Sequence, residues 1–117
     1  MHDFRRLTVW QRSRDLVVAT AKATRTFPHI DRGVIASQLR RSVISIPANI
    51  AEGCGKSSRK ETIRFLQIAA GSATEAENHV LIAAELGYLS AESREELLER
   101  LNAVQRMLNR LMQKLPA

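Results

Sequence analysis

The stretch SQLRRSVISIPANIAEGCGKSSRKE, residues 37–61, carries the features that decide the fold. Its apolar residues recur every three or four positions, which is the spacing of one face of a helix. Pro47 lies inside this pattern, where a proline removes one backbone hydrogen bond and crowds the carbonyl of Val43, four residues back, at a cost of about 3 kcal/mol. A sequence that carries such a penalty among polar residues is shaping a particular surface at that point.

Four polar residues around Pro47 follow one another at steps of four, four and three, and so share one helix face: Arg41, Ser45, Asn49 and Glu52. A kink at Pro47 would re-aim this face and leave the Val43 carbonyl open to a Ser or Asn side chain. Asn49 and Glu52 then have two interpretations. They satisfy backbone or arginine groups where helices cross, which we prefer, or they form part of a ligand site.

Proline, glycine and capping residues divide the chain into four helices, predicted at about residues 8–27, 32–52, 59–86 and 91–115. The boundaries rest on Pro28, an Asp31 N-cap, Gly53 with Gly55, a Ser58–Glu61 capping box, Gly87 and a Ser90 N-cap. Short connections favour antiparallel neighbours. We therefore expect residues 1–117 to form one all-α domain, an antiparallel up-down-up-down four-helix bundle.

Two of these helices show their core face directly in the sequence. The expected core positions are Val34, Ile35, Leu39, Val43, Ile46 and Ile50 in the second helix and Leu97, Leu101, Val104, Leu108, Leu111 and Leu115 in the fourth. Leu98, Met107 and Met112 lie beside the second row and widen it. This wider apolar surface either completes the core or, together with Leu111, serves self-association.

Composition agrees with a small helical protein in a reducing compartment. The 117 residues are 44% apolar but only 4% aromatic, and the sequence has no extended strand-like alternation. The single Cys54 cannot form an internal disulfide, no apolar run has the length of a membrane span, and no signal peptide opens the sequence. These features predict a cytoplasmic protein without a membrane partner.

Positive charge is concentrated in the first half of the sequence. The formal net charge is +6, and residues 1–64 contain 13 Lys and Arg against 5 Asp and Glu, whereas residues 65–117 contain 5 against 7. Arginine, whose planar guanidinium suits bidentate contact with phosphate, makes up 14 of the 18 basic residues. The candidate nucleic-acid-binding residues are Arg5, Arg6, Arg12, Arg14, Arg40, Arg41, Lys56, Arg59, Lys60 and Arg64.

The ligand of this basic cluster is inferred from what surrounds it. Because few aromatic residues lie near these cations to stack bases, we expect backbone or shape recognition, with structured RNA as the favoured nucleic acid. Basic surfaces also bind acidic proteins, so a protein partner is the alternative.

Signals for catalysis are weak, so we expect a protein that is not an enzyme and that binds no metal or cofactor. Candidate ligands and nucleophiles lack partners at a usable spacing: His2, His29 and His79, Cys54, and Glu75, Glu77 and Glu85. No nucleophile, metal or acid–base constellation can be assembled from them.

The run GCGKSS, residues 53–58, has a superficial likeness to a phosphate-binding loop. A Walker motif needs four residues between its first glycine and the GK pair and a strand before it, and here a helix precedes the run. The backbone amides of Ser57 and Ser58 nevertheless open a helix among basic residues, and such a helix start can hold a phosphate oxygen.

The chain resembles the four-helix-bundle proteins of the 23S rRNA-intervening sequence protein family on four runs: DFRRLTVWQRSRDLV, SQLRRSVISIPANIAEG, KSSRKETIRFLQIAAGSATEAE and LGYL. These runs cover nearly the whole chain. The family's motif falls here on Arg40, Arg41, Lys56 and Arg64, and on the residues to which we assign a structural role: Ser45, Pro47, Asn49, Glu52, Gly53 and Ser58.

The resemblance implies a bacterial four-helix bundle that assembles into a ring-like homopentamer. It also implies a relation in fold to the accessory variability proteins of diversity-generating retroelements, which engage reverse transcriptase and nucleic acid. The expected function is therefore that of an oligomeric RNA-binding protein. The alternative is an interaction scaffold or accessory factor for a nucleic-acid enzyme such as a reverse transcriptase.

Overall fold

The computed structural model describes residues 3–116, except for the side chains of residues 31 and 32, and every regular element in that range is a helix. In chain order the elements are the 3-10 helix η1 (Phe4–Arg6), α1 (Thr8–Thr24), the short α2 (His29–Asp31), the π-helix η2 (Arg32–Ala36), α3 (Ser37–Cys54), α4 (Arg59–Glu85) and α5 (Ala91–Lys114). The predicted all-α class with four long helices is therefore confirmed for the described residues.

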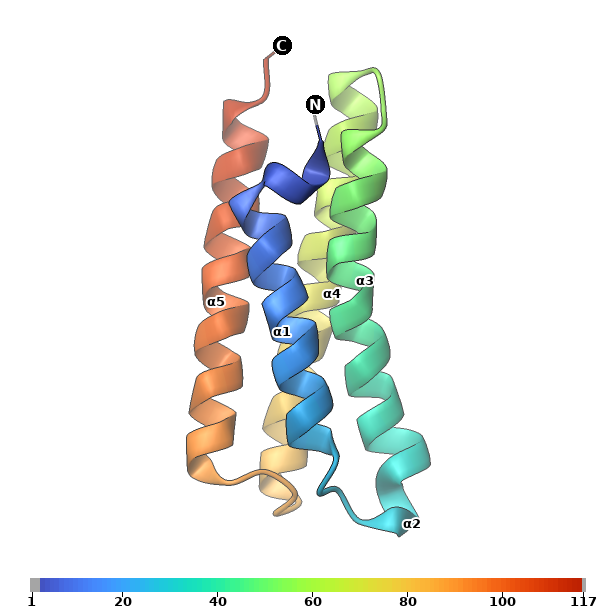
Figure 1. The fold of residues 1–117 in the computed structure, drawn as a ribbon, viewed down its shortest axis with the longest axis vertical. Coiled ribbons are helices and arrows are strands. Elements are labelled where there is room, and N and C mark those ends of the chain that lie inside the picture. The colour runs from blue at the N-terminus through green and yellow to red at the C-terminus, as the bar shows by residue number, and fades with distance from the viewer. Residues whose placement is uncertain (1–2, 117) are drawn as a thin grey trace.

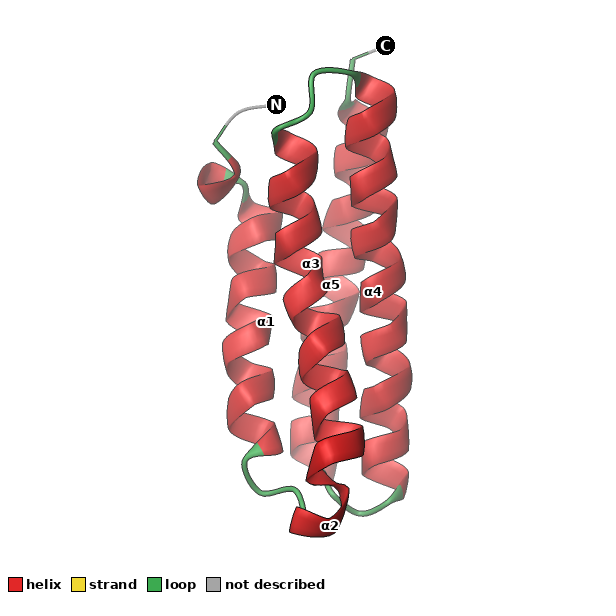
Figure 2. Ribbon diagram, turned by 90° about the vertical axis from the view of Figure 1, so that its right-hand side faces the viewer, coloured by secondary structure: helices red, strands yellow, loops and turns green. Residues whose placement is uncertain are grey.

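The four long helices lie side by side in a body of 47 × 23 × 20 Å (Figure 1). α1 packs against α3 and α5, and α4 packs against the same two helices. The colour gradient of Figure 1 shows the chain direction reversing at each connection, so α1 and α4 begin at the end of the bundle where α3 and α5 finish. Figure 2 shows the α3–α4 turn at this end and α2 at the opposite end. The first helical residue, Phe4, and the last, Lys114, thus lie at the same end of the molecule.

Aliphatic side chains at helical spacing fill the centre of the bundle. The predicted core positions that are buried are Leu39, Val43, Ile46, Ile50, Leu97, Leu101, Val104 and Leu108. The side chains that pack against this core while partly exposed are Ile35, Leu98, Met107, Leu111, Met112 and Leu115, as a wide core stripe requires. Val34 is 60% exposed, so its assignment to the core was wrong. Neighbouring residues of a helix point in different directions, and Ile35, beside Val34 in η2, takes the inward position.

The first connection differs from the prediction made from sequence. α1 ends at Thr24 rather than at residue 27, and Phe27 turns inward until it is 2% exposed. Its ring centroid lies 5.4 Å from that of Tyr88. Helical structure resumes at His29, before the predicted residue 32, and passes through η2 into α3. Burial of a large ring at this end of the bundle therefore sets the end of α1.

The starts of α4 and α5 form as the sequence predicts. The Ser58 hydroxyl accepts a hydrogen bond from the Glu61 amide at 3.1 Å, and the Ser90 hydroxyl accepts one from the amide three residues on at 3.0 Å. Gly87 follows α4 with φ of +81°, a left-handed conformation that glycine adopts without strain. The prediction of Asp31 as the N-cap of the second helix was wrong, because Asp31 is the last residue of α2 and is followed directly by η2.

α3 and α4 approach each other closely where α3 ends. A Cβ atom added at Gly53 would lie 3.2 Å from the Phe65 Cβ and 3.3 Å from the Thr62 carbonyl oxygen, so a larger residue would force α4 to move. The Thr62 hydroxyl donates to the Gly53 carbonyl oxygen at 3.1 Å across this contact. Ala69 and Ala73 are buried farther along α4, and their small side chains keep the helices close.

Replacing Gly53 with alanine should destabilise the bundle, because the added methyl group meets Phe65 and a backbone carbonyl. Overpacking costs about 1–3 kcal/mol, against a gain of up to about 1 kcal/mol from the helix propensity of alanine. We expect a net loss of about 1 kcal/mol in the free energy of unfolding, measured by urea unfolding followed with circular dichroism.

Gly71→Ala is the matched control. Gly71 also lies inside a long helix, but an added Cβ there has no neighbouring atom within 4 Å. The propensity gain should therefore be seen without a clash, and Gly71→Ala should stabilise the protein. Equal effects of the two substitutions would contradict a close approach at Gly53.

Candidate nucleic-acid interface

Three segments bring their basic residues to one end of the bundle. Because the chain direction alternates, residues 3–14, 52–64 and 106–116 all lie toward the end that contains the α3–α4 turn (Figure 1). We define the basic end by Arg5, Arg6, Arg12, Arg14, Lys56, Arg59, Lys60, Arg64, Arg106, Arg110 and Lys114. The same segments contain three acidic residues, Asp3, Glu52 and Glu61, so their net charge is +8, whereas the rest of the chain has a net charge of −2.

Three of these residues were not predicted from the sequence, and all three lie on α5: Arg106, Arg110 and Lys114. They belong to the half of the sequence whose net charge is negative, and only the topology brings them to the basic end. A hollow of about 390 Å³ lined by the start of α1 and the end of α5, including Arg110 and Lys114, shows that these segments are neighbours. Arg59 Nε also donates to the Leu115 carbonyl oxygen at 3.4 Å, which joins α4 to the end of α5.

Two predicted residues lie elsewhere. Arg40 and Arg41 are near the start of α3, and Arg40 is about 24 Å along a helix axis from Lys56. Arg40 Nε donates to the Thr24 hydroxyl oxygen at 2.7 Å and so joins α3 to the end of α1. Arg41 is exposed and forms no side-chain hydrogen bond or ion pair with the described residues. The structure therefore does not bring these two arginines into the basic end.

At the α3–α4 turn, two cations lie against one ring. Lys56 Nζ is 5.1 Å and Arg64 Cζ 4.7 Å from the centroid of Phe65. Arg64 Nε also binds the Glu61 carboxylate at 3.1 Å, so the capping box predicted for Ser58 and Glu61 is only half formed. Cation–π contacts at exposed sites contribute about 0.5–1 kcal/mol each. The start of α4 therefore presents two cations whose side chains are partly ordered.

A hollow of about 200 Å³ opens beside these cations at the N-terminus of α4. The residues that line it are Lys56, Ser57, Ser58, Arg59, Thr62, Leu115 and Pro116. The backbone amides of residues 57–60 have no acceptor among the described residues, as is usual in the first turn of a helix. The phosphate-oxygen site predicted at Ser57 and Ser58 thus has free donors, and it stays a prediction.

The N-terminal segment adds two arginines that lie against aromatic rings. Arg5 Cζ is 5.5 Å from the centroid of Phe4, and Arg14 Cζ is 5.4 Å from that of Trp10. The two rings meet edge to face at 5.2 Å. Arg5 Nε donates to the Asp3 carboxylate at 2.8 Å, and this hydrogen bond lowers the pKa of Asp3 and raises that of Arg5. One of the few carboxylates at the basic end is therefore paired within its own segment.

One polar residue of the family motif, Ser45, joins α3 to α4, and Asn49 bonds to Ser45 from within α3. The hydroxyl oxygens of Ser45 and Ser72 lie 2.7 Å apart across the two helices. Asn49 Nδ2 donates to the Ser45 carbonyl oxygen at 2.8 Å and to its hydroxyl oxygen at 3.0 Å. Asn49 therefore satisfies backbone and hydroxyl groups at a helix contact, in line with the preferred interpretation of this residue.

α3 continues through Pro47 as one helix. Within residues 3–116 no side chain donates to the Val43 carbonyl, so the partner expected there from Ser or Asn is not found. Glu52 is exposed and forms no side-chain hydrogen bond or ion pair with a described residue. Of Asn49 and Glu52, only Asn49 forms a side-chain hydrogen bond with the described residues.

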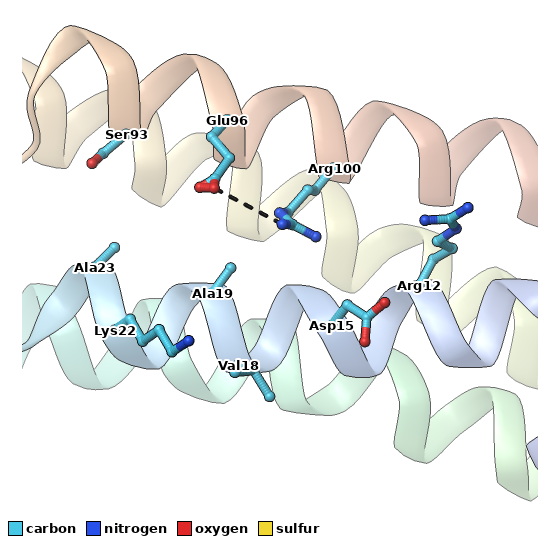
Figure 3. A pocket seen from close by; sticks show the side chains of 9 residues that line it. All are labelled: Arg12, Asp15, Val18, Ala19, Lys22, Ala23, Ser93, Glu96 and Arg100. Carbon is cyan, nitrogen blue, oxygen red and sulfur yellow. Dashed lines mark ion pairs between the residues drawn. The ribbon is translucent and has the colours of Figure 1, made fainter.

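A groove of about 580 Å³ lies between α1 and α5 (Figure 3). Ala19 and Ala23 leave this space open because their side chains are small. Charged side chains of both signs line it: Arg12, Lys22 and Arg100 with Asp15 and Glu96. Figure 3 shows Glu96 and Arg100 projecting from α5 toward α1, 3.9 Å apart. The two carboxylates repel a polyanion, so the basic end is the better phosphate surface.

Of the candidate ligands and nucleophiles that the structure describes, Glu75 and His79 are the two in contact with each other. Cys54 is 5% exposed, and burial raises the pKa of its thiol, which disfavours the reactive thiolate. His79 lies 3.3 Å from Glu75, His29 is exposed, and His2 lies outside the described residues. Residues 3–116 contain no group of three or more His, Cys, Asp or Glu placed to hold a metal ion. Within the same range, no helix is both long and apolar enough to cross a membrane.

The fold and the charge distribution define a class, a small all-α protein of four long helices with cations gathered at one end. The chain belongs to the 23S rRNA-intervening sequence protein family, whose family model matches residues 5–110. It is also similar to the crystal structure of a protein of unknown function from the S23 ribosomal protein family of Bacteroides thetaiotaomicron, with a TM-score of 0.82. The identity is 23%, covering 92% of this chain and 100% of that chain, so the likeness shows the fold alone. No curated protein matches the sequence. The resemblance to the family is thus confirmed.

Two threonines of α1 test whether Arg40 has a structural role. Replacing Thr24 with valine removes the hydroxyl that accepts from Arg40 and donates to the Thr20 carbonyl oxygen. We expect the free energy of unfolding to fall by about 1–2 kcal/mol, because Thr24 is buried and its hydroxyl is the group through which Arg40 joins α3 to α1.

Thr20→Val is the control for this substitution. The Thr20 hydroxyl is buried with no hydrogen-bond partner among the described residues, so its removal should stabilise the protein by about 1 kcal/mol. Urea and thermal unfolding measure both variants. A loss of stability with Thr20→Val, or none with Thr24→Val, would show that these hydroxyl groups are not placed as described.

Proposed function

We propose that this protein is a non-enzymatic, oligomeric nucleic-acid-binding protein that needs no metal or cofactor and whose basic end contacts the phosphates of structured RNA. The observation that carries the proposal is the net charge of +8 on residues 3–14, 52–64 and 106–116. Cations that neutralise phosphates release condensed counterions, which drives binding at low salt. The proposed setting is the cytoplasm, where such ligands occur and a lone cysteine stays reduced.

Many of the cations at the basic end are free to bind a ligand. The side chains that form no hydrogen bond or ion pair with the described residues are Arg6, Arg12, Lys60, Arg106, Arg110 and Lys114. They come from three separate segments, so a ligand that bridges them must present several anionic groups spaced along a surface. A nucleic-acid backbone has this chemistry.

The expectation that few aromatic residues lie near these cations was wrong, because three aromatic rings lie at the basic end. Structured RNA is still favoured over single strands, because these rings already have partners. Phe4, Trp10 and Phe65 each lie against at least one arginine or lysine. Proteins that bind single strands stack bases on open rings, whereas duplex RNA is recognised by its shape and its phosphates. The chemistry of this end therefore supports recognition of the backbone.

We further propose that copies of the chain assemble into a ring-like homopentamer, as the resemblance to the family implies. Exposed apolar side chains on three of the long helices are available for contact between copies: Val18, Ile44, Ile68 and Leu81. A ring that turns every basic end to the same side would bind one RNA through several subunits at once. Such multivalency raises the overall affinity without a new contact.

Native mass spectrometry tests the assembly. We expect a complex of about five times the chain mass of 13.1 kDa, and we expect Ile44→Glu to reduce the assembled fraction because it places a charge on an exposed apolar site. A concentration of about 50 μM is well above the dissociation constant of a stable assembly. A protein that stays monomeric at this concentration would contradict a pentamer.

Charge reversal tests the basic end. In the variant Lys60→Glu with Arg110→Glu, we expect the affinity for a labelled RNA duplex to fall at least about tenfold at low salt, measured by fluorescence anisotropy. Each lost phosphate contact should also reduce the slope of log K against log salt concentration by about 0.7–0.9.

Lys22→Glu with Arg41→Glu is the matched control, because it changes the net charge equally. These two cations are exposed, lie outside the basic end, and form no ion pair with the described residues. We expect a change of less than about threefold, since separated surface charges are screened. An equal loss of RNA affinity in both variants would show that the basic end is not the contact surface. If the unaltered protein does not bind RNA, nucleic acid is not its ligand.

The second candidate function is an interaction scaffold, or an accessory factor for a nucleic-acid enzyme such as a reverse transcriptase. The observation that favours it is a set of exposed apolar side chains at the end opposite the basic end: Ile30, Val34, Ile82 and Leu86. Exposed apolar side chains that gather at one end of a molecule are typical of protein contacts. If Val34→Glu with Leu86→Glu abolished capture of a partner enzyme and RNA affinity were absent, the scaffold would be the better account.

A further inference from the structure

The aromatic ring of Phe65 occupies an unusual position at the basic end. Two cations from different segments lie against it: Lys56 from the α3–α4 turn and Arg64 from α4. Phe65 is half-buried, and its backbone lies close to α3, because its Cβ is 3.2 Å from the place where a side chain at Gly53 would begin. The contact between α3 and α4 therefore fixes where the Phe65 side chain begins, and the ring limits the positions open to the two cations that lie against it.

Arg64 is further restrained in a way that leaves its outer edge available. Its Nε binds the Glu61 carboxylate at 3.1 Å, and its two terminal amino groups have no partner among the described residues. The three donors of the Lys56 ammonium are likewise free of hydrogen bonds to described residues. Terminal guanidinium and ammonium groups are those that bind phosphate oxygens.

We propose that Phe65 is a positioning residue that holds Lys56 and Arg64 as a pair of phosphate ligands for duplex RNA; this inference rests on the proposed function. Long basic side chains lose rotamer freedom when they bind, and a ring that orders them beforehand reduces that loss. Because both cations lie against the ring, we expect it to act through them rather than by stacking on a base. The ring thus acts on the backbone of the RNA through the cations.

The test compares Phe65→Leu, which keeps an apolar side chain, with Phe65→Tyr, which keeps the ring. Anisotropy is measured with an RNA duplex and a single strand of the same length at 50 and 200 mM salt. We expect Phe65→Leu to weaken duplex binding about three- to tenfold and Phe65→Tyr to restore it to within about twofold. Tyr88→Leu, which removes a ring that lies against Phe27 at the opposite end, should leave RNA affinity unchanged.

A double-mutant cycle distinguishes positioning from a general structural effect. Lys56→Ala should weaken duplex binding strongly in the unaltered protein and much less in the Phe65→Leu background, because the ring acts through this cation. If the double variant loses duplex affinity by the product of the two single-variant factors, the two residues act independently and the proposal is overturned. If Phe65→Leu does not fold, as judged by circular dichroism, Phe65→Met takes its place in the cycle.

The remaining outcomes separate the inference from the function on which it rests. A loss confined to the single strand would show that the ring stacks bases, and it would overturn the positioning role while leaving RNA binding in place. Unchanged duplex affinity in Phe65→Leu would do the same. If the unaltered protein binds neither RNA at 50 mM salt, both the proposed function and this inference fail.

Discussion

The contact between Gly53 and α4 is the constraint on which the rest of the bundle depends. Without a side chain at this position, the last turn of α3 comes within reach of the Thr62 hydroxyl, which lies 3.1 Å from the Gly53 carbonyl oxygen and 3.0 Å from that of Ser58. One buried hydroxyl thus links the end of α3 to the start of α4. Because the turn between them is short, this link also sets where Lys56 projects and the direction in which α4 leaves.

Chain direction then determines how charge is distributed. The sequence suggests a division between its two halves, but in the fold the division runs along the long axis, since the end of α5 returns beside the start of α4. The basic end thereby gains the positive charge of Arg106, Arg110 and Lys114, which are far in sequence from its other residues. The free cations of that surface and its occupied aromatic rings support a ligand with repeated anionic groups. Membership of the family establishes the fold, while the function rests on this chemistry.

Local signals in the sequence were enough to predict most of the helices. The burial of Leu39 and Ile46 follows from periodicity, and the starts of α4 and α5 follow from Ser58 and Ser90, whose bonds join residues three apart. What could not be predicted depends on contacts between distant segments. Phe27 ends α1 early because it packs near Tyr88, and Arg40 joins Thr24 instead of the basic cluster. Eight of the eleven residues of the basic end were predicted from the concentration of basic residues in the first half of the sequence. The other three could be placed there only from the order and direction of the helices.

The placement of Phe4 and Lys114 at the same end has a practical consequence for anyone who handles this protein. An affinity tag or fusion partner placed before Phe4 or after Lys114 would lie beside the basic end and compete for space with whatever binds there (Figure 1). A polyhistidine or acidic tag would also alter the local charge. The turn between α4 and α5, around Gly87 and Ser90, lies at the far end of the bundle and is the better place for a fluorophore or a surface attachment.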